Sequence, residues 1–204
     1  MSRATRWAGV SPTDRRAERR SLLLDAALEL FGDGGESAVS VRSVCRVSEL
    51  NTRYFYENFS DTDELLGAVY DRVAAELAHC LADAMAAEPQ HDAARLRAGI
   101  RAVLEFSSAE PRRGAILFTQ GRANRVLADR RSKARDQLRE LVLDEGRRTD
   151  PRSGRAGLEV GAAMYTGAMA ELAQQWLAGT LGDDLDAVVD HSVRLLLHGS
   201  GARP

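Results

Sequence analysis

The chain has 204 residues, 44% of them hydrophobic, with five prolines and only 5% aromatic side chains, a composition that favours helices and can fill a sizeable core. The formal net charge of −2 excludes a general polycation, so any binding of nucleic acid must depend on a local concentration of positive charge. Two cysteines make no disulfide framework, and no apolar run approaches the roughly 20 residues that span a bilayer. We therefore expect a cytoplasmic protein that has no membrane segment.

Such a concentration of positive charge occurs near the start of the chain, with arginines at 3, 6, 15, 16, 19 and 20. We expect residues 1–13 to form a flexible basic arm, and a merely solvated leader is the alternative. The first helix is predicted over residues 14–32, because apolar residues recur on one face at helical spacing. These residues are Leu23, Ala26, Ala27, Leu30 and Phe31.

Two short helices follow, over residues 41–47 and 52–59. Ser40 and Asn51 are suitable N-caps for them, since their side chains can accept hydrogen bonds from the first free backbone N–H groups. Phe55 and Phe59 lie one turn apart and should point inward. Two short helices joined by a three- to four-residue turn describe a helix-turn-helix, so we expect residues 14–60 to form a DNA-binding domain.

The rest of the chain, residues 61–199, is predicted to be a second, entirely helical domain, followed by a short tail at 200–204. Ser60 is a suitable cap for its first helix. Apolar residues at helical spacing predict helices over residues 61–87, 96–110, 116–118, 126–142, 158–176 and 185–196. The fold class is therefore all-α.

The outer face of the helix-turn-helix carries side chains that can bind DNA. Arg53 can pair with guanine, while Thr52 and Tyr54 can contact a base edge or a thymine methyl group. Tyr56 and Asn58 suit phosphate, which positions the protein without specifying sequence. Two residues at the start of the first short helix could also contact phosphate: Ser40 and Arg42.

The residue pattern of this segment closely resembles that of the TetR family of bacterial transcriptional regulators. The resemblance runs through Leu23-Leu24-Asp25-Ala26-Ala27, Leu30-Phe31, Gly35, Ser40-Val41, Tyr56-x-x-Phe59 and Glu64-Leu65-Leu66, and again from Trp176 to Gly199. It implies about nine helices, a two-fold dimer built on the last two helices and a ligand pocket in the body. It also implies a palindromic DNA operator and a small-molecule effector that releases the protein from it.

Some positions depart from the family's pattern. Tyr56 matches the family's phosphate-contacting tyrosine, whereas Asn58 stands where a histidine is usual. Glu49 replaces the usual turn glycine, so the turn must either adopt a conformation that glutamate tolerates or bear a modest strain. Thr62 replaces a lysine that often contacts the DNA backbone.

Two further sets of residues are assigned from their place on the predicted helices. Bulky apolar residues that would surround a central cavity, and thus bind a largely apolar effector, are Tyr70, Met85, Phe106, Phe118, Met164, Tyr165 and Met169. Residues expected at the dimer interface, where a heptad seam suits packing against another long helix, are Leu158, Ala162, Leu172, Trp176, Val189 and Leu196. Ordinary packing inside one subunit is the alternative for both sets.

We find no spacing of histidines and cysteines that suits a metal, no catalytic triad and no phosphate-binding glycine loop, so no cofactor and no enzymatic activity are expected. Three classes of function remain. A ligand-released repressor is favoured over a small-molecule-binding helical protein that does not bind DNA, because the outward residues of the second short helix suit DNA. A helical enzyme is the third class.

Overall fold

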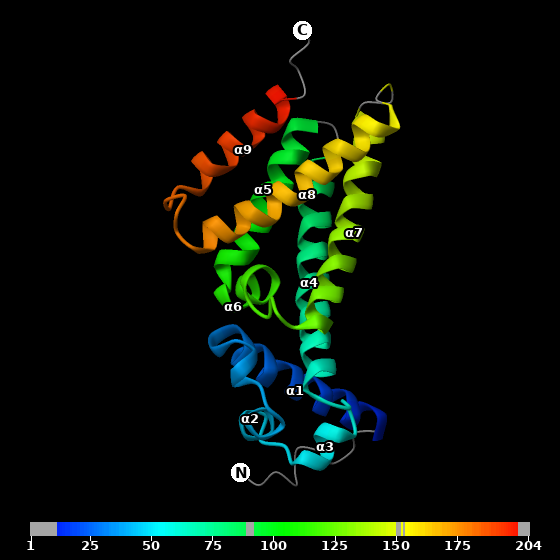
Figure 1. Cartoon of the computed structure of the whole chain (residues 1–204), viewed down its shortest axis with the longest axis vertical. Coiled ribbons are helices and arrows are strands. Elements are labelled where there is room, and N and C mark those ends of the chain that lie inside the picture. Colours follow the sequence, from blue (N-terminus) through cyan, green and yellow to red (C-terminus); the bar gives the residue numbers. More distant parts are fainter. Residues whose placement is uncertain (1–11, 89–91, 150–151, 153, 200–204) are drawn as a thin grey trace.

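The computed structural model describes residues 12–88, 92–149, 152 and 154–199. In this part of the chain all regular structure is helical, with nine α-helices and no strand, which confirms the predicted fold class. The molecule is elongated: a small group of helices lies at one end, and a bundle of longer helices forms the rest (Figure 1). The predicted arm and tail lie outside the described residues, apart from residues 12 and 13, which belong to the first helix.

The small group of helices comes from the N-terminal part of the chain. Its elements are α1 (Pro12–Gly34), the single turn η2 (Glu36–Ala38), α2 (Val41–Val47) and α3 (Thr52–Tyr56). In Figure 1, α2 and α3 lie at the end of the molecule farthest from the last helix, α9. Helix α3 is therefore placed at an exposed extremity, where it can reach a large partner.

The bundle is built from the remaining elements: α4 (Thr62–Ala86), α5 (Asp92–Ala109), α6 (Pro111–Gly114), the π-helical turn η3 (Ala115–Thr119), α7 (Arg125–Thr149), α8 (Arg155–Leu177) and α9 (Leu185–Gly199). Helix α4 leads from the N-terminal helices into the bundle and packs against α5 and α7 (Figure 1). Helix α8 crosses α5 and α7 obliquely, and α9 packs against α5. Every long helix of the bundle is thus linked, directly or through one neighbour, to α4.

One apolar core joins the N-terminal helices to the bundle. Phe31 of α1, Phe55 of α3 and Phe59 are at most 2% exposed, and they belong to the same cluster as Leu65 and Val69 of α4. A second cluster fills the bundle between α5, α8 and α9. The predicted domain boundary at residues 60 and 61 falls in the turn before α4, although the core continues across it.

Several element boundaries differ from those expected, among them the end of α3, the start of α4 and the end of α7. Helix α3 ends at Tyr56, because Glu57 and the residues after it turn the chain toward α4. The N-cap of α4 is Asp61 in place of Ser60: Asp61 accepts a hydrogen bond from the N–H of Glu64 at 2.8 Å, and the Glu64 carboxylate accepts one from the N–H of Ser60 at 2.7 Å. Helix α7 continues two turns past residue 142, and these turns carry an ion-pair network.

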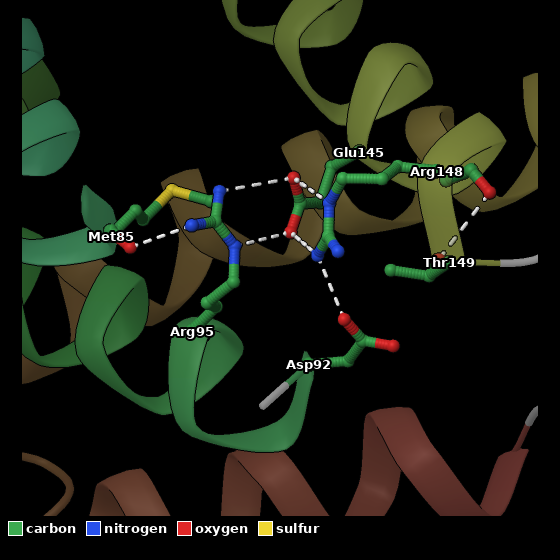
Figure 2. Close-up of polar contacts among 7 residues, drawn as sticks. Met85, Asp92, Arg95, Glu145, Arg148 and Thr149 are labelled. Atoms are coloured by element: carbon green, nitrogen blue, oxygen red, sulfur yellow. Dashed lines mark hydrogen bonds and ion pairs between the residues drawn. The ribbon is translucent and has the colours of Figure 1, made fainter. Parts of the chain in front are cut away.

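This network ties together the ends of α4, α5 and α7 (Figure 2). The guanidinium of Arg95 on α5 donates to both oxygens of Glu145 on α7, at 2.7 and 3.2 Å, and to the carbonyl of Met85 on α4 at 2.7 Å. Arg148 donates to Glu145 at 2.7 Å and to Asp92 at 2.7 Å. The hydrogen bonds from Arg148 and Arg95 together lower the pKa of Glu145 to about 2.

We predict that Glu145→Gln lowers the free energy of unfolding by about 1–2 kcal/mol near neutral pH, because the charged form of Glu145 is preferred in the folded state and the pair is only partly solvated. The folded-state pKa lies below the unfolded one, so this stability is present above about pH 4.3 and is lost as the pH falls toward 2. Chemical denaturation at several pH values measures it. Glu140→Gln, an exposed position on the same helix, is the matched control, and an equal loss in both variants would contradict the prediction.

Candidate DNA interface

Helices α2 and α3 form the predicted helix-turn-helix. The start of α2 is fixed by a reciprocal cap: Ser40 Oγ accepts from the N–H of Ser43 at 3.1 Å, and Ser43 Oγ accepts from the N–H of Ser40 at 2.9 Å. The start of α3 is fixed by Asn51, whose side chain accepts from the N–H of Tyr54 at 3.2 Å. Both predicted caps are confirmed, and they set where each short helix begins.

The turn between α2 and α3 is a Schellman motif with glutamate at its left-handed position. The N–H of Leu50 donates to the carbonyl of Cys45 at 3.0 Å, and the N–H of Glu49 donates to the carbonyl of Arg46 at 3.4 Å. Glu49 has a φ of 54°, the only positive φ of a non-glycine residue in the described chain. Of the two options expected for this departure from glycine, the protein thus adopts the strained one.

The inner face of α3 is buried and its outer face is open. Phe55 is fully buried, while the side chain of Arg53 is 83% exposed and Tyr56 is 62% exposed. Thr52 is exposed as well, and so are Ser40 and Arg42 at the start of α2. These five predicted residues therefore lie on the surface of one helix pair, where hydrogen-bonding groups are available to a partner.

Tyr54 and Asn58 are less free than the sequence suggested. The ring of Tyr54 is half-buried beneath the guanidinium of Arg19, whose central carbon lies 4.5 Å from the ring centre. The amide of Asn58 donates to the carbonyl of Tyr54 at 2.8 Å, so one of its two N–H groups is already engaged. Both residues brace α3 in addition to any contact with DNA.

Sequence reasoning missed the residues that hold the C-terminal end of α3. Arg16 and Arg20 of α1 donate to the carbonyls of Glu57 and Asn58, at 2.7 and 3.2 Å, and Arg20 also stacks on Phe59 at 4.3 Å. Cations at this end of a helix oppose its negative pole. The spacing of Arg16, Arg19 and Arg20 already places them on one helical face, but the sequence does not show that this face meets α3.

The residues predicted to line a pocket are divided between the two cores. Tyr70 and Phe106 are buried in the cluster that includes α1, whereas Met169 is buried and Tyr165 half-buried in the cluster of α5, α8 and α9. Phe118 contacts both clusters. The two remaining members of the predicted set differ in exposure, since Met85 is half-buried and Met164 lies on the surface, 69% exposed.

Two tyrosine hydroxyls lie in this largely apolar interior. Burial raises the pKa of Tyr165 to about 12. Burial also raises the pKa of Tyr70, although Arg131, whose guanidinium lies 5.9 Å from the ring centre, partly opposes the effect. Both phenols therefore stay neutral well above physiological pH.

The residues predicted for the dimer interface lie mostly inside the subunit. Ala162 and Val189 are 1% and 0% exposed, so the expectation that they contact a second subunit is wrong. Three others are half-buried against the second core cluster: Leu172, Trp176 and Leu196. Leu158 is half-buried too, and a Cβ added at Gly146 of α7 would meet it at 3.0 Å. The heptad seam thus packs largely against the helices of its own subunit.

A different face of α8 and α9 is open and apolar. Val160 and Met164 of α8 are 58% and 69% exposed, and Leu195 of α9 is 75% exposed. Glycines at positions 157, 161 and 167 share the open side of α8, and a Cβ built on any of them would meet nothing within 4 Å. Small residues beside exposed apolar ones let a second helix approach closely.

Other kinds of site were sought in the same part of the chain. No group of three or more histidine, cysteine or acidic residues is placed to hold a metal ion among the residues described. Within those same ranges, no helix is both long and apolar enough to cross a membrane. The exposed helix-turn-helix is the best-defined site that the described residues present.

The fold and this site define a helix-turn-helix protein with an all-helical body. Residues 23–69 match the family model described as bacterial regulatory proteins, tetR family. The HTH-type transcriptional repressor Rv3405c of Mycobacterium tuberculosis is 34% identical over 70 residues, which are 34% of this chain and 37% of that protein. The chain therefore matches little more than a third of the length of this curated relative.

Solved structures are similar over nearly the whole chain. A TetR-like transcriptional regulator from Rhodococcus sp. RHA1 has a TM-score of 0.70 and 24% identity, and the match covers 92% of this chain and 98% of that one. The transcriptional regulator FadR from Bacillus subtilis, solved in complex with stearoyl-CoA, has a TM-score of 0.70 and 15% identity over 86% and 96%. Residues 23–69 are thus similar to the tetR family, and the described chain shares its fold with TetR-like regulators.

The left-handed turn residue gives a test of the geometry at the interface. We predict that Glu49→Gly is more stable than Glu49→Ala by about 0.5–1 kcal/mol, because only glycine adopts a positive φ without strain. Both variants remove the same side-chain interactions, so the difference isolates the backbone. The control pair is Glu140→Gly and Glu140→Ala in the middle of α7, where the glycine variant should be the less stable of the two. Thermal unfolding of the four variants measures these differences in stability. Equal stability of Glu49→Ala and Glu49→Gly would refute the left-handed conformation at this turn.

Proposed function

We propose that the protein is a homodimeric transcriptional repressor that binds a palindromic DNA operator and is released from it by a small, largely apolar effector. The observation that carries this proposal is the exposed outer face of α3, whose inner face is fixed in the core. A short helix held in this way fits the major groove of DNA. Such a regulator acts where the bacterial chromosome lies, in the cytoplasm, and needs no catalytic residues.

Each of the five exposed residues predicted to contact DNA has a role in this proposal. Arg53 and Thr52 contact base edges from the start of α3, since the N-terminal residues of a recognition helix enter the groove first. Tyr56, Ser40 and Arg42 contact phosphates and set the position of α3 on the duplex. The exposure of all five side chains supports these roles.

A second copy of the chain is the proposed partner of the open face on α8 and α9. A palindromic operator requires two recognition helices related by two-fold symmetry, about one DNA turn apart. In this arrangement Val160, Met164 and Leu195 pair with the same face of the second subunit and form a four-helix bundle. The exposure of these side chains supports the contact. Because Ala162 is buried, the proposed interface is centred on this open face and not on the heptad seam expected from the sequence.

The effector is proposed to bind where the two core clusters meet. Phe118 contacts both clusters, and Tyr165, which packs against the second cluster, carries a hydroxyl that is neutral at physiological pH. An apolar molecule with one polar group suits such a place. The stearoyl-CoA bound by the FadR of similar fold supports an effector with a long apolar part.

The connection between the body and α1 offers a route for release. Arg112 of α6 donates to both carboxylate oxygens of Asp33, at 2.7 and 2.8 Å, and a Cβ added at Gly32 would lie 2.5 Å from that of Arg112. A shift of α6 would therefore move α1. The effector can lower the affinity for the operator only by the difference in its own binding free energy between the two states.

Selection of DNA from a random pool by the purified protein, followed by gel-shift titration, tests the proposal directly. Enrichment of an inverted repeat that the protein binds in the nanomolar range is the expected result. Failure to enrich any sequence would leave a small-molecule-binding protein without DNA-binding activity as the better account.

We predict that Tyr56→Phe weakens binding to the selected operator and to unrelated DNA by a similar factor, about three- to tenfold. The lost hydroxyl would contact phosphate, which contributes affinity without sequence information. Gel-shift titrations on both kinds of DNA measure the two factors, with the melting temperature as a check on folding. Loss confined to the operator would assign Tyr56 to a base contact instead.

We also predict that Met164→Glu raises the dissociation constant of the dimer at least about a hundredfold, because two carboxylates would be buried near the symmetry axis without partners. Light scattering should then show a monomer at micromolar concentration, and operator affinity should fall with it. Leu141→Glu, at an exposed leucine on α7, is the matched control. A Met164→Glu variant that remains dimeric would move the interface elsewhere.

A further inference from the structure

The carboxylate of Glu57, directly after α3, lies between two guanidinium groups. Its Oε1 accepts a hydrogen bond from Nε of Arg53 at 3.0 Å, and its Oε2 lies 3.8 Å from Nη2 of Arg19. Arg19 is itself held on α1 and stacks on Tyr54. A continuous chain of charges thus runs from Arg19 on α1 through Glu57 to the exposed guanidinium of Arg53 on α3.

The contact with Glu57 engages only one edge of Arg53. Nε is occupied, and within the described chain the terminal nitrogens Nη1 and Nη2 have no protein partner. These two atoms donate in parallel, which is the geometry that O6 and N7 of guanine accept. The side chain of Arg53 is 83% exposed and would sample many orientations without a partner. The contact with Glu57 therefore reduces the conformational entropy that Arg53 loses when DNA binds.

The position of Glu57 also has a cost. A carboxylate on the DNA-facing helix pair repels phosphate and lowers the affinity for DNA of any sequence. Arg19 compensates for this charge only in part, because its guanidinium lies 3.8 Å away. Glu57 would thus lower the affinity for DNA in general while it orients Arg53 toward a base. The combined effect favours discrimination between DNA sequences at the expense of overall affinity.

We propose that Glu57 is a specificity-determining positioning residue, which holds the guanidinium of Arg53 so that its Nη1–Nη2 edge reads a guanine in the operator. The proposal rests on the proposed DNA-binding function and assigns a base preference to it. Arg53 makes the contact, Glu57 orients Arg53, and Arg19 anchors Glu57 to α1.

Two substitutions separate orientation from charge. Glu57→Gln removes the charge, so affinity for unrelated DNA should rise by about two- to threefold, while discrimination between guanine and other bases at the contacted pair should fall by about two- to fivefold. Glu57→Asp keeps the charge but shortens the reach, so discrimination should fall without the rise in general affinity. Arg53→Ala should abolish the preference, a loss of roughly tenfold or more.

The experiment is selection from random DNA followed by titration on operators altered at single base pairs. It uses the full-length wild type, the three single variants and Arg53→Ala/Glu57→Gln, with melting temperatures for all. Glu88→Gln, which removes one exposed charge from the body, is the matched control and should behave as the wild type. In the Arg53→Ala background, Glu57→Gln should not change discrimination further.

Three results would overturn the inference while leaving the proposed function intact. The first is unchanged discrimination in both Glu57 variants, and the second is an effect of Glu57→Gln on discrimination that persists in the Arg53→Ala background. The third is an Arg53→Ala variant that loses affinity equally for all sequences with a smaller salt dependence, which would assign Arg53 to phosphate. A wild type that selects no sequence would instead refute the proposed function itself.

Discussion

The burial of Phe55 and Phe59 is the constraint on which the candidate interface depends. Helix α3 has five residues, and a helix of this length has no stability of its own in water. It persists because these two rings are at most 2% exposed in a core that includes α1 and the first turns of α4. The outer face of α3 can be polar and open because its inner face supplies the free energy that fixes the backbone.

The same constraint explains how the arginines near the start of α1 are used. In a chain with a net charge of −2, binding of DNA depends on a local concentration of cations, and the sequence suggested that this cluster would serve that purpose. The structure instead places Arg16, Arg19 and Arg20 against the end of α3, on backbone carbonyls, a carboxylate and two aromatic rings. Positive charge is thus concentrated beside α3, and the same arginines hold that helix in place.

Those features that depend on residues close together along the chain could be predicted from the sequence. Caps at Ser40 and Asn51 are set by neighbours three residues away, so local pattern was sufficient to find them. The fold class and the helix-turn-helix follow from periodicity and from the family's motifs. The partner of α8 was beyond such reasoning, because the helix has two apolar faces and spacing alone cannot tell which one meets its own subunit. Ala162 lies on the inner face and Met164, two residues later, on the outer one.

The continuity of the core also limits how an effector could act. If the helix-turn-helix were a separate domain on a flexible linker, a change in the bundle would not be transmitted to α3. Here Leu65 and Val69 of α4 pack in the same cluster as Phe55, and α4 is also a main element of the bundle. A packed core resists gradual deformation, so α3 must follow any change in the direction of α4 as a rigid unit. In the proposed dimer, the separation of the two α3 helices is therefore set by the packing around α4, and the proposed effector need not touch α3 to change it.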